Sequence, residues 1–187
     1  MNTNSNSWDD PAGLEKRVNI YLEVNAKSLF NKPGLDLDDI EMWDSLGDYA
    51  KGEAVKDFET DLPTGKKVTW WASVDEKSED EGFSIKIEQI EIIGENCLFH
   101  RVRLPGKKGK VQATVKKLDK DCKSTYAIWF SILNKEGESV AFRLDPKLKG
   151  TTTAITYSMI LQNTINTFPI DAVLKKKLLQ VLLDHQN

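Results

Sequence analysis

This chain of 187 residues has few of the residues from which catalytic and metal sites are usually built. It contains only two histidines and two cysteines, and Cys97 and Cys122 do not have the spacing of a zinc site. His100 is the one histidine far from a chain end, so no Ser-His-Asp or Cys-His arrangement can be argued. We expect no catalysis, no metal and no cofactor, and keep an enzyme of unrecognised type as the last alternative.

The two cysteines leave two interpretations open. A disulfide is one of them, but disulfides rarely persist in a reducing compartment. Free cysteine commonly behaves as a small buried apolar residue, which is the interpretation that we favour.

Long apolar runs are also missing. None approaches the ~20 residues needed to span a bilayer, so we expect no membrane span. Residues 1–8 are rich in Asn and Ser and have neither the basic nor the apolar region of a secretory signal. We therefore expect a cytoplasmic protein, or one exported by a route that needs no such signal, with residues 1–16 as a disordered arm.

Charge is abundant but unevenly distributed. Residues 1–95 hold 22 acidic and 10 basic side chains, whereas residues 96–187 hold 7 acidic and 16 basic ones. Such an asymmetry bears on association and partners rather than on fold. Either acidic loops neutralise basic strands within one molecule, or copies stack head to tail.

Alternating apolar and polar residues predict seven or eight short strands. They cover residues 18–24, 68–74, 83–92, 98–104, 111–115, 126–132 and 140–144. The apolar positions change parity after Ile87, which predicts a β-bulge near Glu88 and Gln89. Because turn signals rather than long helices separate the strands, we predict a mainly β fold over residues 17–150, an antiparallel, jelly-roll-like β-sandwich.

Two regions depart from this pattern. Residues 35–54 are rich in Asp and predict an irregular acidic insertion with one or two helical turns. Residues 151–187 predict a C-terminal helical extension, packed on the domain or on a neighbouring subunit, although residues 151–167 fit a strand as well as a helix. From Asp171 onward one helix face is apolar and is our candidate assembly surface: Leu174, Leu178, Val181 and Leu182.

Clusters of like charge have two interpretations each. The acids around Asp36 and Glu41 could form a calcium loop, but the EF-hand register fails and a solvated loop is favoured. The five acids of residues 75–81 are typical of a soluble hairpin tip. The lysines of residues 107–123 lack interleaved aromatic side chains, and the pI is near 5.5, so we expect no nucleic acid partner.

Tryptophan supplies the candidate ligand site. Trp70 and Trp71 are adjacent, so in a strand they point to opposite faces, and Trp129 points opposite to its apolar neighbours. An outward tryptophan can stack on a sugar or contact a partner chain. The alternative is that both faces of the strand are covered. Our candidate ligand-binding residues are Trp70, Trp71 and Trp129.

Several segments resemble the AidA/PixA family of bacterial inclusion body proteins. They are VNIYLEVNAKSLF (18–30), LPTGKKVTWW (62–71), FSIKI (83–87), YAIWFSI (126–132) and FRLDPKL (142–148), within residues 17–149. The resemblance implies a β-sandwich that accumulates as cytoplasmic inclusions, in a family with members similar to sugar-binding lectins. Lys66-Lys67 and Leu144 depart from the family pattern.

These observations lead to two main hypotheses. The first is a non-catalytic protein that associates with itself as a homo-oligomer, or with another protein. The alternative is a β-sandwich module that binds a carbohydrate or another small ligand through outward tryptophans.

Overall fold

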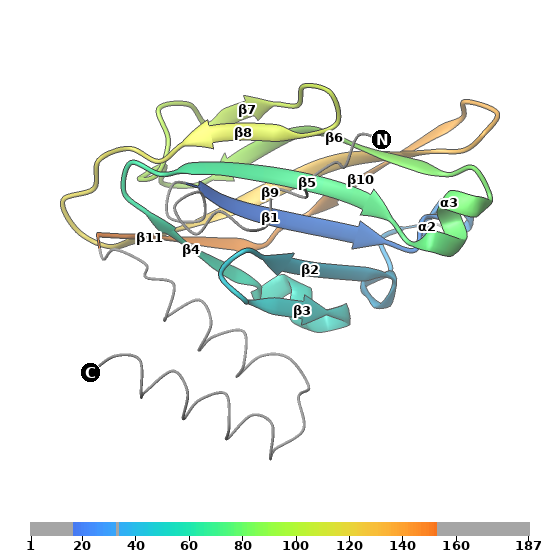
Figure 1. The fold of residues 1–187 in the computed structure, drawn as a ribbon, viewed down its shortest axis with the longest axis horizontal. Coiled ribbons are helices and arrows are strands. Elements are labelled where there is room, and N and C mark those ends of the chain that lie inside the picture. Colours follow the sequence, from blue (N-terminus) through green and yellow to red (C-terminus); the bar gives the residue numbers. More distant parts are fainter. Residues whose placement is uncertain (1–16, 33, 153–187) are drawn as a thin grey trace, which may run out of the picture.

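Two β-sheets pack face to face in the computed structural model, which describes residues 17–32 and 34–152 (Figure 1). The predicted N-terminal arm and, from residue 153 on, the predicted C-terminal extension with its assembly face lie outside the described residues, whereas Thr151 is the last residue of a strand. Among the described residues no helix is long and apolar enough to cross a membrane. The two packed sheets confirm the prediction of a mainly β, sandwich-like fold.

The first sheet has five strands in the order β3-β2-β1-β5-β8. β1 (Arg17–Val24) lies at its centre, and every second residue from Val18 is buried. β1 pairs with β5 (Lys67–Val74) in parallel, whereas the other neighbours are antiparallel. The remaining strands are β2 (Ile40–Asp44), β3 (Tyr49–Lys51) and β8 (Val111–Thr114).

The second sheet has six strands, built around the long strand β9 (Cys122–Leu133). β6 (Ser84–Ile93) pairs along one side of β9, and the register shifts between Ile87 and Gln89, so the predicted bulge is confirmed. The other strands are β7 (Arg103–Pro105) beside β6, β11 (Lys147–Thr151) and β10 (Ser139–Leu144) beside β9, and β4 (Glu59–Pro63) beside β11.

Short helices fill the connections. α2 (Ala26–Asn31) follows β1, and the Asn25 side chain accepts a hydrogen bond from the Ser28 amide at its start. α3 (Glu76–Asp80) follows β5 and is capped in the same way by Asp75. Two 3-10 helices, η2 (Leu37–Asp39) and η3 (Gly52–Asp57), flank β2 and β3.

Four predictions of local structure were wrong. Residues 35–54 hold β2 and β3 rather than an irregular insertion, although the predicted helical turns are present as η2 and the start of η3. The strand β2 was missed because the polar residue Asp44 occupies one of its buried positions. The sheets are mixed rather than antiparallel, since β1 pairs with β5 and β4 with β11 in parallel. Residues 98–104 form a loop that reaches a strand only at Arg103, and residues 75–81 hold α3 and its two cap residues rather than a hairpin tip.

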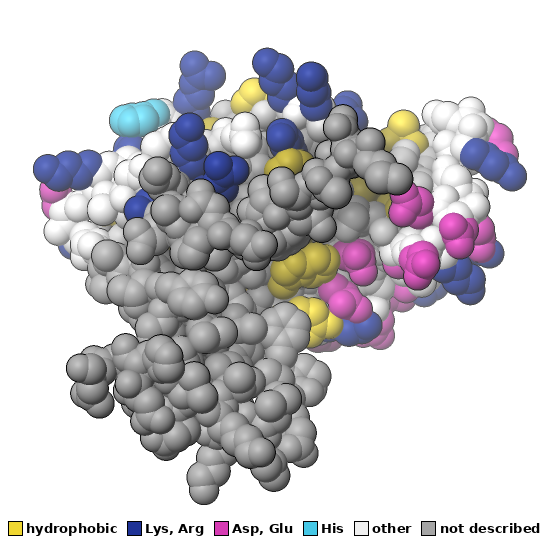
Figure 2. Space-filling view, viewed as in Figure 1, with side chains coloured by type: hydrophobic (Ala, Val, Ile, Leu, Met, Phe, Trp, Pro, Cys, Tyr) yellow, Lys and Arg dark blue, Asp and Glu magenta, His cyan; other side chains and the backbone are white. Residues whose placement is uncertain are grey.

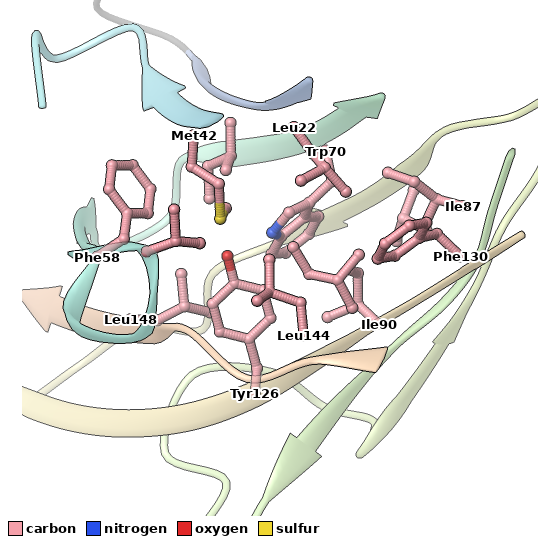
Figure 3. Packing of buried hydrophobic residues seen from close by; sticks show 14 of the residues in the cluster. Leu22, Met42, Phe58, Trp70, Ile87, Ile90, Tyr126, Phe130, Leu144 and Leu148 are labelled. Atoms are coloured by element: carbon pink, nitrogen blue, oxygen red, sulfur yellow. The ribbon is translucent and has the colours of Figure 1, made fainter. Parts of the chain in front are cut away.

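The core lies between the sheets. Its largest buried side chains are Trp70, Tyr126, Phe99 and Phe130, and Figure 3 labels the first two and Phe130. The Trp70 ring lies 5.9 Å from that of Phe99 and 6.0 Å from that of Tyr126, which joins β5 of one sheet to β9 of the other. Full burial of one such side chain stabilises the fold by roughly 1.5–3 kcal/mol.

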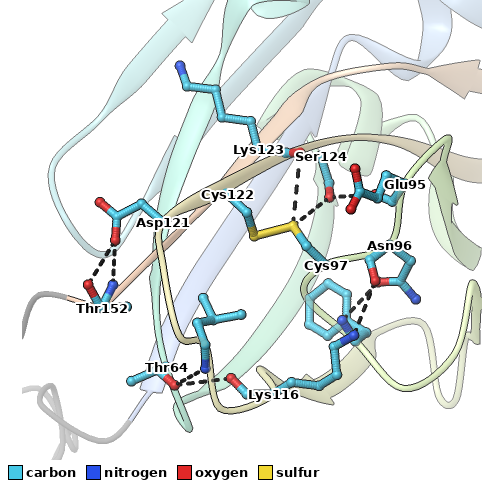
Figure 4. The surroundings of a disulfide bond; sticks show 12 residues. Thr64, Glu95, Asn96, Cys97, Lys116, Asp121, Cys122, Lys123, Ser124 and Thr152 are labelled. Carbon is cyan, nitrogen blue, oxygen red and sulfur yellow. Dashed lines mark hydrogen bonds between the residues drawn. A yellow bond between two sulfur atoms is a disulfide. The ribbon is translucent and has the colours of Figure 1, made fainter.

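Cys97 and Cys122 form a disulfide, so the interpretation as two unpaired apolar residues was wrong (Figure 4). The β6–β9 ladder pairs Ile93 with Thr125, and the chain that continues from β6 therefore runs beside the start of β9. The Ser124 hydroxyl donates to the carbonyl of Glu95 at 3.0 Å and lies 3.4 Å from Cys97 Sγ. The register between two strands thus brings the cysteines together, and sequence spacing alone does not show this.

Candidate functional site

A cleft of about 830 Å³ lies between the loop that precedes β7, the turn after β7, and β8. We call it the basic cleft. Its lining residues are Phe99, His100, Arg101, Leu104, Pro105, Gly106, Lys107, Lys108, Lys110, Gln112, Ala113 and Thr114. Four of them are permanent cations at pH 7, and none is a carboxylate.

None of the ion pairs among the described residues involves these four cations. Lys110 contacts an aromatic ring instead, since its Nζ lies 4.3 Å from the centre of the Trp71 ring. The cleft therefore has a positive charge that the described part of the molecule leaves largely uncompensated.

Residues 107–110 form the tight turn at the edge of this cleft. The Lys107 amide donates to the Lys110 carbonyl at 2.8 Å, and Lys108 and Gly109 both have positive φ, at 55° and 76°. This is the geometry of a type I′ turn, in which Asn or Gly normally takes the first central position. Among the described residues, Lys108 is the one non-glycine residue with a positive φ.

A second hollow, of about 620 Å³, lies at the ends of α2 and α3 beside the hairpin of β9 and β10. We call it the acidic groove. Four of its lining residues are carboxylates, Asp80, Glu81, Glu136 and Glu138, and Lys135 is the single cation among them. The rings of Phe30 and Phe83, 5.5 Å apart, provide an apolar part of its wall.

The basic cleft and the acidic groove lie in different parts of the surface. In Figure 2, Lys and Arg gather along the upper edge, where Figure 1 places β7 and β8, and Asp and Glu gather toward the end that carries α3.

Elsewhere the two charged halves of the chain neutralise each other. Lys123 pairs with Glu59 at 2.9 Å and Lys147 with Asp57 at 2.7 Å, so β9 and β11 neutralise acids of β4 and of the end of η3.

The outer face of the first sheet carries a row of aromatic side chains, which we call the aromatic row. Strand register places Trp71 beside Tyr21, Tyr21 beside Trp43, and Trp43 beside Tyr49. Tyr21 and Trp43 are stacked, with ring centres 5.4 Å apart. Trp71 is the most exposed of the row, at 38%, and its indole N–H donates to Asn19 Oδ1 at 3.4 Å.

The predicted ligand residues do not form one site. Trp70 is fully buried in the core, so of the adjacent pair only Trp71 points outward. Trp129 belongs to the other sheet, where its indole N–H donates to Glu91 Oε2 at 3.1 Å and the Arg143 guanidinium lies over its ring. The sequence analysis missed Tyr21 and Trp43, although Tyr21 is an outward aromatic residue in a strand that it had predicted.

Four buried polar atoms gather inside the sandwich. Among the described residues, Asp44 Oδ2, Thr60 Oγ1, Trp70 Nε1 and Tyr126 OH have no hydrogen-bond partner. Figure 3 shows the Trp70 nitrogen and the Tyr126 hydroxyl in the interior between the sheets. Burial, and then the charge of Asp48, raise the pKa of Asp44 to about 7, and nearby Thr60 acts in the opposite direction.

The other candidate sites find little support. The described residues contain no group of three or more side chains that could hold a metal ion. Asp36 and Asp39 contact Lys32 instead, at 2.9 and 3.3 Å, and the hydrogen bond from Lys32 lowers the pKa of Asp36. His100 lines the basic cleft without a carboxylate beside it in that lining, so no acid-base pair can be argued there.

No family model and no curated protein matches this chain. Among solved structures, the chain is similar to an inclusion body protein, PixA, from Burkholderia cenocepacia, with a TM-score of 0.46 and 9% identity over 74% of this chain and 95% of that one. The resemblance to this family found in the sequence is thus found again in the structure comparison. The chain is also similar to a 2,6-sialyltransferase from a Photobacterium species, with a TM-score of 0.30 and 13% identity over 51% of this chain and 17% of that one.

Proposed function

We propose that this protein is non-catalytic and associates with copies of itself, the basic turn of one copy, residues 107–110, binding the acidic groove of the next. The observation that carries the proposal is the pair of surfaces of opposite charge, of which the acidic one is partly compensated, since Glu81 pairs with Lys27 at 2.9 Å. The basic cleft has four cations and no carboxylate in its lining, and the acidic groove has four carboxylates and one lysine. Association of this kind would accumulate the protein as inclusions.

The turn is suited to such a contact. Lys108 keeps a left-handed backbone that costs a residue with a side chain about 1–2 kcal/mol, and it places a cation at the tip where Asn or Gly would be easier. In the groove, Phe30 and Phe83 offer apolar surface beside the carboxylates. The two surfaces differ, so the contact is heterologous and generates rings or open filaments.

Light scattering across a salt series tests the proposal. Surface charges are screened over about 8 Å at physiological ionic strength and over about 3 Å at 1 M, so assemblies formed at low salt should dissociate as salt rises. A strict monomer at low salt and high protein concentration would contradict the proposal.

Charge reversal locates the contact. The variants K107E/K108E and E136K/E138K should each lose assembly, and an equimolar mixture of the two should regain it, because the reversed surfaces match. K117E/K120E changes the net charge as much as K107E/K108E does, but touches residues outside both linings. Assembly that survives both groove and turn variants, or that K117E/K120E abolishes equally, would refute this contact.

The predicted assembly face of residues 174–182 gives a different signature. Association through Leu174, Leu178, Val181 and Leu182 would be apolar, and salt would not weaken it. A Leu174→Glu/Leu178→Glu variant would abolish association of that kind and leave a salt-dependent one intact. The two contacts can therefore be separated in one set of measurements.

Carbohydrate binding on the aromatic row is a second candidate function. The observation that favours it is the alignment of Trp71, Tyr21 and Trp43 across three neighbouring strands, with Asn19 and Glu23 beside them on the same face. Aromatic rings with adjacent amide and carboxylate groups can stack on a sugar and bind its hydroxyls.

Titration with a panel of glycans tests this function, and binding should shift the tryptophan fluorescence. The W71A variant should lose the response, whereas W129F, on the other sheet, should keep it. A flat response to every glycan would count against this function.

A further inference from the structure

We infer that the basic cleft is a binding site for a small organic phosphate with several negative charges. The inference rests in part on the proposed function, because the same turn takes part in the proposed contact between copies. A phosphate bound in the cleft would compete with the acidic groove and dissolve the assembly.

The charge of the cleft fits a phosphate group. Arg101, Lys107, Lys108 and Lys110 approach from the loop before β7, from the turn and from the start of β8. A guanidinium binds phosphate oxygens through two parallel hydrogen bonds, and an ammonium adds a point charge. Because no carboxylate lines the cleft, an arriving anion meets no like charge there.

The apolar lining of the cleft fits the organic group that carries the phosphate. Phe99 and Leu104 are 2% and 8% exposed, and Pro105 and Ala113 continue this apolar surface. Gln112 and Thr114 add side chains that can donate and accept hydrogen bonds. A volume of about 830 Å³ lies within the roughly 300–1,000 Å³ of small-molecule sites, which combine apolar walls with a few polar groups.

The segment that leads into the lysine turn is held against the bulge of β6. The Gly106 amide donates to the Glu88 carbonyl at 2.6 Å, at the bulge of β6. A Cβ on residue 106 would come within 2.1 Å of the Ile87 carbonyl oxygen, so the chain crosses the bulge closely enough that only glycine fits. The segment that carries the cations of the turn is therefore in direct contact with the bulge of β6.

The surroundings favour a small molecule over a nucleic acid. A single strand needs a basic groove that follows its backbone, with aromatic side chains to stack on successive bases. Beyond β5 from the cleft, the outer face of the first sheet carries Glu23 on β1 and Glu41 on β2, which would repel a backbone that extended across this sheet. The net charge of the whole chain is −3.

Calorimetric titration with ATP, tripolyphosphate and adenosine at low salt tests the inference. The protein used is E136A/E138A, which weakens the acidic groove, leaves the cleft intact and adds no positive charge. ATP should bind more tightly than tripolyphosphate, and adenosine should show no measurable binding. K107E/K108E in the same background should lower the ATP affinity by about tenfold or more, since the loss of about 1.4 kcal/mol is a factor of ten, and K117E/K120E should change it less than about twofold.

Trp71 provides a second readout. Tripolyphosphate that binds Lys110 should change the environment of the Trp71 indole and shift its fluorescence. W71F should lose this signal while calorimetry reports an unchanged affinity.

Each outcome bears on one proposal. ATP binding that K107E/K108E and K117E/K120E reduce equally would overturn the cleft as the site, and a single-stranded oligonucleotide that binds more tightly than ATP would overturn the small-molecule assignment. If E136A/E138A binds ATP but the unaltered protein never assembles, the cleft is a phosphate site and the proposed self-association fails. If the protein assembles and no phosphate binds, the reverse holds.

Discussion

At the scale of single residues, Asp44 has the least favourable environment for its charge. It is 5% exposed, one carboxylate oxygen accepts hydrogen bonds from the amides of Leu46 and Asp48, and the other has no partner among the described residues. Its pKa is about 7 in the folded protein and near 3.8 in the unfolded chain. As the pH increases, the Asp44 carboxyl ionises in the unfolded chain at a lower pH than in the folded protein. Above the pKa of the unfolded chain, ionisation therefore stabilises the unfolded state relative to the folded one.

Stability should therefore fall as the pH rises from about 4 to about 7 and change little above that, by an amount on the order of 4 kcal/mol. Asp44→Asn retains the acceptor oxygen and cannot ionise, so its stability should be flatter with pH and higher than that of the unaltered protein at pH 8. Urea unfolding of both proteins at pH 5 and pH 8 measures this. Equal pH dependence in the two proteins would show that Asp44 is not the titrating group.

Lys108 gives a second prediction at the residue scale. Its positive φ is one that Asn tolerates better than Lys, so Lys108→Asn should raise the free energy of unfolding by about 0.5–1 kcal/mol. The same change removes a cation from the turn and should weaken the salt-dependent assembly. A gain in stability together with a loss of assembly would show that the strained residue is kept for binding; thermal unfolding and light scattering on one variant decide this.

At the scale of elements, the crossing of the β6 bulge by the segment after β7 depends on Gly106. Gly106→Ala would place a methyl group 2.1 Å from the Ile87 carbonyl oxygen and 2.8 Å from that of Glu88, both of them backbone atoms that cannot swing aside. We expect a loss of about 2 kcal/mol or more in the free energy of unfolding. Gly137→Ala is the control, because it carries the cost of a positive φ, which Gly106 does not have, and has no atom within 4 Å of its Cβ. Equal losses in both variants would argue against the close approach at the bulge.

At the scale of the whole molecule, the Cys97–Cys122 bond links the chain beyond β6 to the start of β9 across 25 positions. Closing a loop of this size stabilises a protein by about 3.5 kcal/mol in the chain-entropy model. C97S/C122S should lower the free energy of unfolding by about that amount, and dithiothreitol should have the same effect on the unaltered protein. If dithiothreitol also destabilised the double variant, the effect would not come from this bond.

Charge at this scale is only partly compensated. Lys123, Lys147 and Lys149 meet acids of the β4 region, as expected if the two halves of the chain interleave. The four cations of the basic cleft, Arg101, Lys107, Lys108 and Lys110, meet none among the described residues, which leaves the separate basic surface on which the proposed association depends.

Much of the strand pattern was readable because burial alternates along each strand. Val18, Ile20, Leu22 and Val24 predicted β1, and the change of parity after Ile87 predicted the bulge of β6. Where a core position is polar, this signal fails. Asp44 in β2 and Thr60 in β4 are buried, and both strands were missed.

The sequence by itself determined the mainly β fold, the resemblance to inclusion body proteins and the existence of a surplus of cations after residue 96, because alternation and charge are local properties of the chain. Only the tertiary structure decided that Trp70 is core and Trp71 surface, that Tyr21 and Trp43 stand beside Trp71, and that the two cysteines meet. These facts depend on which strands are neighbours and in which register they pair. That choice is made by contacts between residues far apart in the sequence, and no local pattern records it.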